Sequence, residues 1–120
     1  ARPQPLEPGP EAERLRREVR AAAEPLIAYW AERMGVPAPD LSVRLMRTRW
    51  GSCNKAKLRV SLAVELGRRD PELLEYVVVH ELTHLIHSNH GPGFYSTMST
   101  YLPDWKEKRR ALNRPAVPAG

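Results

Sequence analysis

The chain has very little cysteine and no long hydrophobic run. Cys53 is the single cysteine among 120 residues, which excludes an internal disulfide framework and a cysteine-rich zinc ribbon. No apolar run approaches the about 20 residues that a membrane-spanning helix needs. The first ten residues show no basic stretch followed by an apolar one, so we expect no signal peptide. These absences predict a cytoplasmic protein without a membrane partner.

Length and charge predict one small basic domain. The sequence holds 19 Lys and Arg against 14 Asp and Glu, a formal net charge of +5, and 42% of its residues are hydrophobic. Prolines gather in the first ten and the last six residues. We therefore predict flexible tails at residues 1–10 and 114–120, with a single domain between them at 11–113. The positive charge is compatible with an anionic partner but does not establish one.

The first half of the chain predicts a helix followed by strands. Apolar residues recur at helical spacing over 11–34, where Pro25 should kink or divide the helix. Two segments with strand alternation, 41–45 and 58–62, are separated by Gly51-Ser-Cys-Asn54. A connection containing Gly, Ser and Asn between two such segments predicts an antiparallel hairpin.

The second half predicts three helices. Asp70 and Pro71 form a start signal, a capping side chain followed by proline in the first turn, for a helix that reaches about Ser88. Short helices should follow at 94–102 and 106–112, the last one capped by Asp104. With the hairpin, these elements predict the α+β class.

All four histidines lie in one eleven-residue segment that begins at His80. His80 and His84 are four residues apart, so on a helix both rings lie on one face and can reach the same metal ion. Glu81 follows the first histidine and is angled toward the same cleft. Its carboxylate can take a proton from a water activated by the metal. Because a hydrolytic zinc usually has three protein ligands, one more ligand is required.

Two downstream histidines could supply the third ligand. His87 would lie about 10 Å along a straight helix from His80, too far for three ligands to converge on one ion. If the helix ends before His90, the glycines at 91 and 93 let the chain turn back and bring this ring to the metal. We predict His80, His84 and His90 as ligands of one Zn²⁺ per chain, and His87 as a supporting or surface residue.

Three segments resemble the YgjP-like metallopeptidase domain family, which is related to the SprT-like and other zincin-type metallopeptidases. They occur in the family's order and together relate residues 11–113 to it. The segments are Arg49-Trp-Gly-Ser-Cys53, the stretch from Tyr76 to Leu85, and the stretch from Ser88 to Tyr95 followed by Leu102-Pro-Asp-Trp105.

This resemblance implies a minimal zincin-like domain with an N-terminal helix, a small antiparallel sheet, an active-site helix and short C-terminal helices. It also implies that His80, His84 and His90 bind zinc and that Glu81 is the general base. Two positions depart from the family pattern, because a tyrosine, Tyr95, replaces the usual indole and Gly93 replaces a bulkier residue.

A basic stretch accompanies the predicted hairpin. The segment from Leu41 to Val60 contains no acid and six cations, which are Arg44, Arg47, Arg49, Lys55, Lys57 and Arg59. These side chains could contact the phosphates of a nucleic acid or a nucleotide. The alternative is a solvated face that protects the sheet edges from aggregation, which is the simpler interpretation.

The leading interpretation of the sequence is a zinc-dependent metallopeptidase that acts on a protein or peptide, which could bind by adding a strand to the edge of the hairpin. One alternative is a metal-dependent nucleotide phosphohydrolase, which the resemblance also admits. Another is a basic nucleic-acid-associated module with a structural metal. Imidazole ligands favour zinc over magnesium. Tyr95, Tyr101 and Arg49 are candidates for stabilising an oxyanion, although core packing of the two tyrosines and solvated charge on Arg49 are the favoured interpretation.

Overall fold

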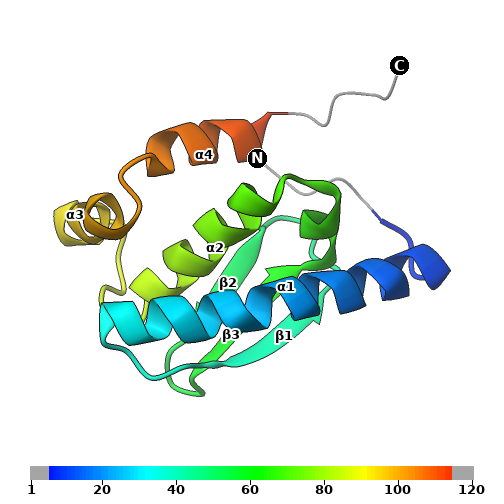
Figure 1. Cartoon of the computed structure of the whole chain (residues 1–120), viewed down its shortest axis with the longest axis horizontal. Helices are drawn as coiled ribbons and strands as arrows, with labels where there is room; N and C mark the ends of the chain where they lie inside the picture. The colour runs from blue at the N-terminus through cyan, green and yellow to red at the C-terminus, as the bar shows by residue number, and fades with distance from the viewer. Residues whose placement is uncertain (1–5, 115–120) are drawn as a thin grey trace.

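The computed structural model of the chain describes residues 6–114. These residues form four α-helices, a three-stranded sheet and one short 3-10 helix, which confirms the predicted α+β class (Figure 1). The elements are α1 (Pro10–Met34), β1 (Asp40–Arg44), β2 (Gly51–Asn54), β3 (Arg59–Ala63), η1 (Val64–Arg68), α2 (Pro71–Thr83), α3 (Pro92–Tyr101) and α4 (Trp105–Asn113). Of the predicted tails, residues 1–5 and 115–120 lie outside the described residues, and Pro10 already begins α1.

Helices α1 and α2 cover one face of the sheet, and α4 runs beyond α2 (Figure 1). The core fills the space between this face and the helices, with Val43, Val60 and Leu62 buried on the sheet side. The opposite face is polar, and Arg44 and Arg59 are exposed on it. No helix within residues 6–114 is long and apolar enough to cross a membrane.

Helix α1 is continuous through Pro25, so the expected division of the helix is wrong. Pro25 is exposed, whereas Ala23 and Ile27 on either side of it are buried against the core. Burial of the apolar stripe on both sides compensates for the one hydrogen bond that proline removes from the helix.

The predicted hairpin between 41–45 and 58–62 is wrong, because β1 and β3 are neighbours that run parallel. The segment Gly51–Asn54, which the sequence suggested as an interruption, is the strand β2 and pairs antiparallel with β3. The hairpin turn lies after it, where Lys57 N–H donates to Asn54 Oδ1 at 3.0 Å and Leu58 adopts a φ of 50°. The sheet order is therefore β1-β3-β2, with β2 at one edge.

Helix α2 ends at Thr83 instead of near Ser88. The N–H groups of Ile86 and His87 both bond to the Thr83 carbonyl, at 3.0 and 2.8 Å, which closes the last turn tightly. The predicted start at Asp70 and Pro71 is confirmed, but Asp70 makes no side-chain capping bond. The Asp104 carboxylate likewise does not cap α4 and lies 3.3 Å from Lys108 Nζ.

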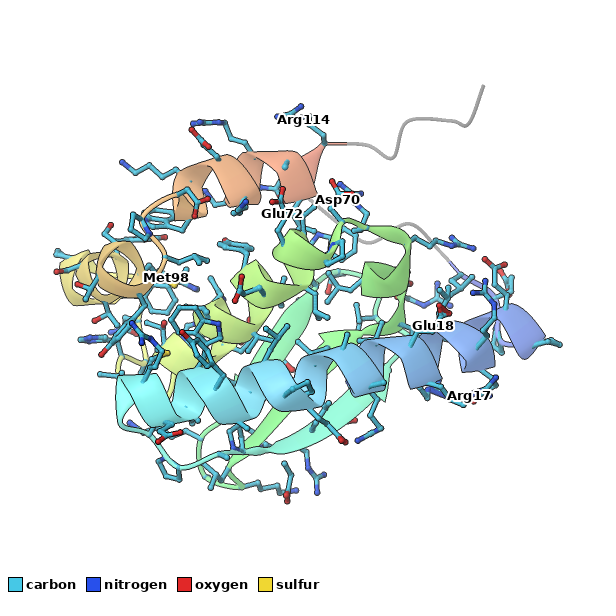
Figure 2. The ribbon with its side chains drawn as sticks, in the orientation of Figure 1. Arg17, Glu18, Asp70, Glu72, Met98 and Arg114 are labelled. Atoms are coloured by element: carbon cyan, nitrogen blue, oxygen red, sulfur yellow. The ribbon has the colours of Figure 1, made fainter. Side chains whose placement is uncertain are left out.

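Arg69 joins the segment before β2 to the end of α4. Its guanidinium lies 5.4 Å from the centre of the buried Trp50 ring. The same group donates to the carbonyls of Ala111, Leu112 and Arg114 at 2.8, 3.2 and 3.2 Å. Figure 2 shows Arg114 at the end of α4, with Asp70 at the start of α2 below it.

Candidate metal centre

The structure brings His80, His84 and His90 together. His80 lies in the last turn of α2, His84 caps that helix, and His90 lies in the loop before α3. One ring nitrogen from each histidine lies within 4.8 Å of the others. His84 Nε2 and His90 Nε2 are 3.1 Å apart. Two nitrogens bound to one tetrahedral zinc are separated by about 3.3 Å, so this spacing fits a shared metal ion.

A buried phenylalanine, Phe94, packs against the rings of all three histidines. Its ring centre lies 5.0 Å from that of His80 and 4.7 Å from those of His84 and His90. Phe94 is 1% exposed and stands in the first turn of α3, directly after the loop that carries His90. The sequence patterns assigned no role to Phe94, although it is the chain's single phenylalanine and directly follows Gly91-Pro92-Gly93.

His87 does not join the cluster, but it supports it. Its Nε2 lies 3.0 Å from Thr97 Oγ1, so its ring points toward α3. Its backbone carbonyl lies 3.2 Å from His84 Nδ1. A proton on His84 Nδ1 satisfies this carbonyl and leaves the lone pair of Nε2 facing His90, as a metal ligand requires. Gly93 makes room for the His87 ring, because a Cβ there would lie 2.9 Å from His87 Cε1.

Glu81 lies beside the histidine cluster and is almost buried. Its side chain extends from α2, the residue is 5% exposed, and Oε2 is 2.9 Å from His80 Nδ1. Strand β2 packs against this side chain, since a Cβ on Gly51 would lie 3.1 Å from Glu81 Cγ. Glu81 is therefore held between its own helix and the edge strand, next to the three rings.

These groups open into a cleft of about 740 Å³. Strand β2 and the residues that flank it form one wall, and the end of α4 forms the other. The cleft is lined by Arg49, Trp50, Gly51, Ser52, Cys53, Lys55, Tyr76, Val77, His80, Glu81, His84, Ser88, His90, Arg109, Leu112 and Asn113.

Of the three proposed oxyanion-stabilising residues, Arg49 alone lines this cleft. Tyr95 stacks on Trp105 with a ring separation of 4.9 Å, and Tyr101 packs edge-on against Trp30 at 6.3 Å. Tyr76, which the sequence analysis missed, does line the cleft. The sequence did indicate a place for Tyr76 in the cleft, because it lies four residues before His80 and therefore on the same face of the helix.

Burial sets the protonation of several groups in the cleft. It raises the pKa of Tyr76 to about 12, with Arg109 opposing and Glu81 adding to the shift, so the hydroxyl keeps its proton at neutral pH. Burial, followed by the proximity of His80 and His84, lowers the pKa of His90 and favours the neutral imidazole that a metal binds. The Cys53 thiol has a raised pKa because of burial and then Glu81, so it stays protonated and weakly reactive.

Comparison with known proteins identifies one family. The profile described as "YgjP-like, metallopeptidase domain" matches residues 11–115. A search of curated protein sequences found no significant match.

Two solved structures share the fold. The crystal structure of the metallopeptidase zymogen jannalysin of Methanocaldococcus jannaschii superposes with a TM-score of 0.65, at 19% identity over 74% of this chain and 91% of that chain. The metallopeptidase zymogen abylysin of Pyrococcus abyssi gives a TM-score of 0.67, at 20% identity over 74% of this chain and 90% of that chain.

Proposed function

The chain belongs to the YgjP-like metallopeptidase domain family, and we propose that it is a zinc-dependent peptidase whose ion is held by His80, His84 and His90. Glu81, the residue after the first ligand in the His-Glu-x-x-His segment, is the proposed general base. The observation that carries this proposal is the convergence of three imidazole nitrogens within 4.8 Å, at the wall of an open cleft.

The donor set fits zinc better than other common metals. Imidazole nitrogen is a ligand that zinc binds well, whereas magnesium and calcium prefer oxygen. Three histidine ligands would leave a bound zinc able to take a water as well, which is typical of catalytic rather than structural zinc sites.

The protein's own groups then divide the work of hydrolysis. A bound zinc ion would supply Lewis acidity, which lowers the pKa of a water toward neutrality and polarises the scissile carbonyl. Glu81 accepts the proton of the attacking water on a carboxylate oxygen and returns it to the nitrogen of the leaving amine. Its contact with His80 and its packing against β2 keep that oxygen in one position.

The free edge of β2 is the proposed binding surface for the peptide backbone. The bond from Ala63 N–H to the Trp50 carbonyl sets the alternation of the β2–β3 ladder. That alternation leaves the N–H and C=O groups of Gly51 and Cys53 pointing away from β3, toward the open edge. The other sheet edge is occupied, because Arg20 and Arg16 of α1 donate to the carbonyls of Leu41 and Val43 in β1. Within residues 6–114, the edge of β2 is therefore the sheet edge that can accept a substrate strand, and this edge adjoins the histidine cluster.

Removal of the metal tests the proposed chemistry directly. We expect a chelator to abolish hydrolysis of casein and model peptides, and stoichiometric zinc to restore it. The same preparations should be tested on a panel of nucleoside triphosphates, with zinc and with magnesium. Hydrolysis of nucleotides without hydrolysis of any peptide would reject the peptidase and favour the phosphohydrolase alternative.

Gly51 is expected to position Glu81. A Cβ at this position would lie 2.8 Å from Val77 Cγ1 and 3.1 Å from Glu81 Cγ, so Gly51→Ala must push β2 and the glutamate apart. We expect hydrolysis to fall about tenfold or more, because displacements of about 1 Å are costly in catalysis, while metal content is retained. Elemental analysis and peptide hydrolysis of the same sample measure both quantities.

Gly67→Ala is the matched control for this substitution. It creates a similar contact, 2.8 Å from Leu15 Cδ2, at the packing of η1 against α1 and away from the cleft. Overpacking destabilises such sites by about 1–3 kcal/mol, so both variants should unfold at lower temperature. Equal hydrolysis by both, after correction for the folded fraction, would contradict a positioning role for Gly51.

A further inference from the structure

The cleft beside the histidine cluster carries an unbalanced positive charge. Arg49, Lys55 and Arg109 line it, and Glu81 is the one carboxylate among the described residues of its lining. All three cations are exposed, and within residues 6–114 none of them is paired with a carboxylate. In the same range, five other Lys and Arg side chains are paired with carboxylates, namely Arg14, Arg16, Arg20, Arg68 and Lys108.

We propose that Arg49, Lys55 and Arg109 select peptides that carry carboxylates near the cleaved bond. This inference rests on the proposed peptidase function and names the substrate class for it. Glu81 lies on the buried wall, and its single charge is outnumbered by the three exposed cations of the cleft.

The two cations on the strand side frame the proposed backbone-binding edge. Arg49 stands two residues before β2 and Lys55 directly follows it. The four residues of β2 cover roughly 14 Å at about 3.4 Å each, so a peptide paired with this edge has one cation near each end. Acidic side chains a few residues to either side of the cleaved bond would meet these charges.

Arg109 lies on the α4 side of the cleft, where a stack of aromatic rings supports its guanidinium. Its guanidinium lies 4.9 Å from the centre of the Trp105 ring, which stacks on Tyr95 at 4.9 Å, and Tyr95 in turn stacks on His90 at 6.3 Å. A guanidinium that stacks through its face keeps its N–H edge free for a two-pronged bond to a carboxylate. A chain of stacked rings therefore connects this cation to the proposed third metal ligand, and Arg109 lines the cleft on the α4 side.

The positive electrostatic potential of the cleft continues on the adjoining face of the sheet. A groove next to the cleft shares Arg49 and Lys55 with it and adds Arg44, Lys57 and Arg59. Such a surface attracts acidic chains and repels basic ones. We assign it to a peptide rather than a nucleic acid because its cations continue into the cleft of the histidine cluster, where the β2 edge offers main-chain pairing that only a polypeptide can complete.

Matched peptides test this selection. Three quenched fluorescent peptides would share one central sequence and an amidated end, with flanks of Glu, Gln or Lys. We expect kcat/KM to be about tenfold higher for the Glu peptide than for the Gln peptide, lowest for the Lys peptide, and the differences to shrink as salt screens the charges. A fourth peptide with Gln flanks and a free C-terminal carboxylate separates recognition of the chain end from recognition of side chains.

Charge-removing variants localise the effect. Lys55→Gln and Arg109→Gln should each reduce the preference for Glu flanks at least twofold. Arg17→Gln is the matched control, because Arg17 is exposed on α1 and points away from the cleft (Figure 2), and it should leave the preference unchanged. Equal kcat/KM for all four peptides would overturn the inference and leave the peptidase intact.

Binding to zinc-loaded Glu81→Gln, followed by fluorescence anisotropy, separates this inference from the proposed function. Preferential binding of the Glu peptide without hydrolysis by the wild-type protein would support carboxylate recognition and reject the peptidase. Tighter binding of a single-stranded oligonucleotide than of the Glu peptide would overturn the inference in favour of a nucleic-acid partner.

Discussion

Glu81→Gln should lower the rate of peptide hydrolysis by about 10²–10⁴-fold while leaving bound zinc unchanged, since positioned general bases contribute factors of this size. The amide keeps the shape of the carboxylate and its place between α2 and β2, but it cannot accept a proton at neutral pH. Glu81 is 5% exposed and contacts His80, so the substitution preserves packing better than alanine would. Steady-state kinetics with elemental analysis of the same sample measures both parts of the expectation.

The matched control for this variant is Glu75→Gln. Glu75 is also on α2, but its carboxylate accepts from Trp30 Nε1 at 2.8 Å and does not line the cleft. This substitution should retain normal hydrolysis. If Glu81→Gln kept wild-type turnover, the assignment of the general base would be wrong, even with zinc fully bound.

His90→Ala should remove most of the bound zinc, and with it the activity. The proposed site would keep His80 on α2 and His84 at the end of that helix. The loss of a direct ligand should weaken zinc binding by more than the about 10–100-fold that follows from changing a residue behind a ligand. Because His90 is exposed in a loop, its removal leaves no cavity in the core. Zinc affinity can be measured by competition with a chromophoric chelator, together with the zinc-dependent rise in melting temperature.

His87→Ala decides between the two candidates for the third ligand. The variant keeps the backbone carbonyl that contacts His84 Nδ1, and it loses the ring that contacts Thr97 and packs beside Gly93. We expect it to retain stoichiometric zinc. Zinc retained by His90→Ala but lost by His87→Ala would reverse the assignment.

The sequence predicted the cluster well because its information is local. The spacing of His80 and His84 at the end of a helix fixes their common face. The glycines after His90 do not act through a left-handed turn, because Gly91 is extended and Gly93 lies inside α3. The position of Phe94 below all three rings depends on how α3 packs against α2. No periodicity in the sequence describes that contact, and Phe94 was missed for this reason.

The sheet was predicted less well because strand pairing is not local. The four residues of β2 include Gly, Ser and Asn, which are typical of turns, and pairing with β3 overrides that preference. With β2 on one side of β3, the other side is left for β1, which pairs parallel to β3. The two alternating segments alone could not distinguish this order from a direct hairpin.

The link formed by Arg69 has a consequence for how the molecule admits its ligands. Widening the gap between β2 and α4 would break three hydrogen bonds and the contact with Trp50 together. These contacts hold β2 and α4 at a set separation before a peptide binds. We therefore expect the cleft between β2 and α4 to select substrates by shape. It should bind extended, unfolded peptides and exclude folded loops that are too wide to enter.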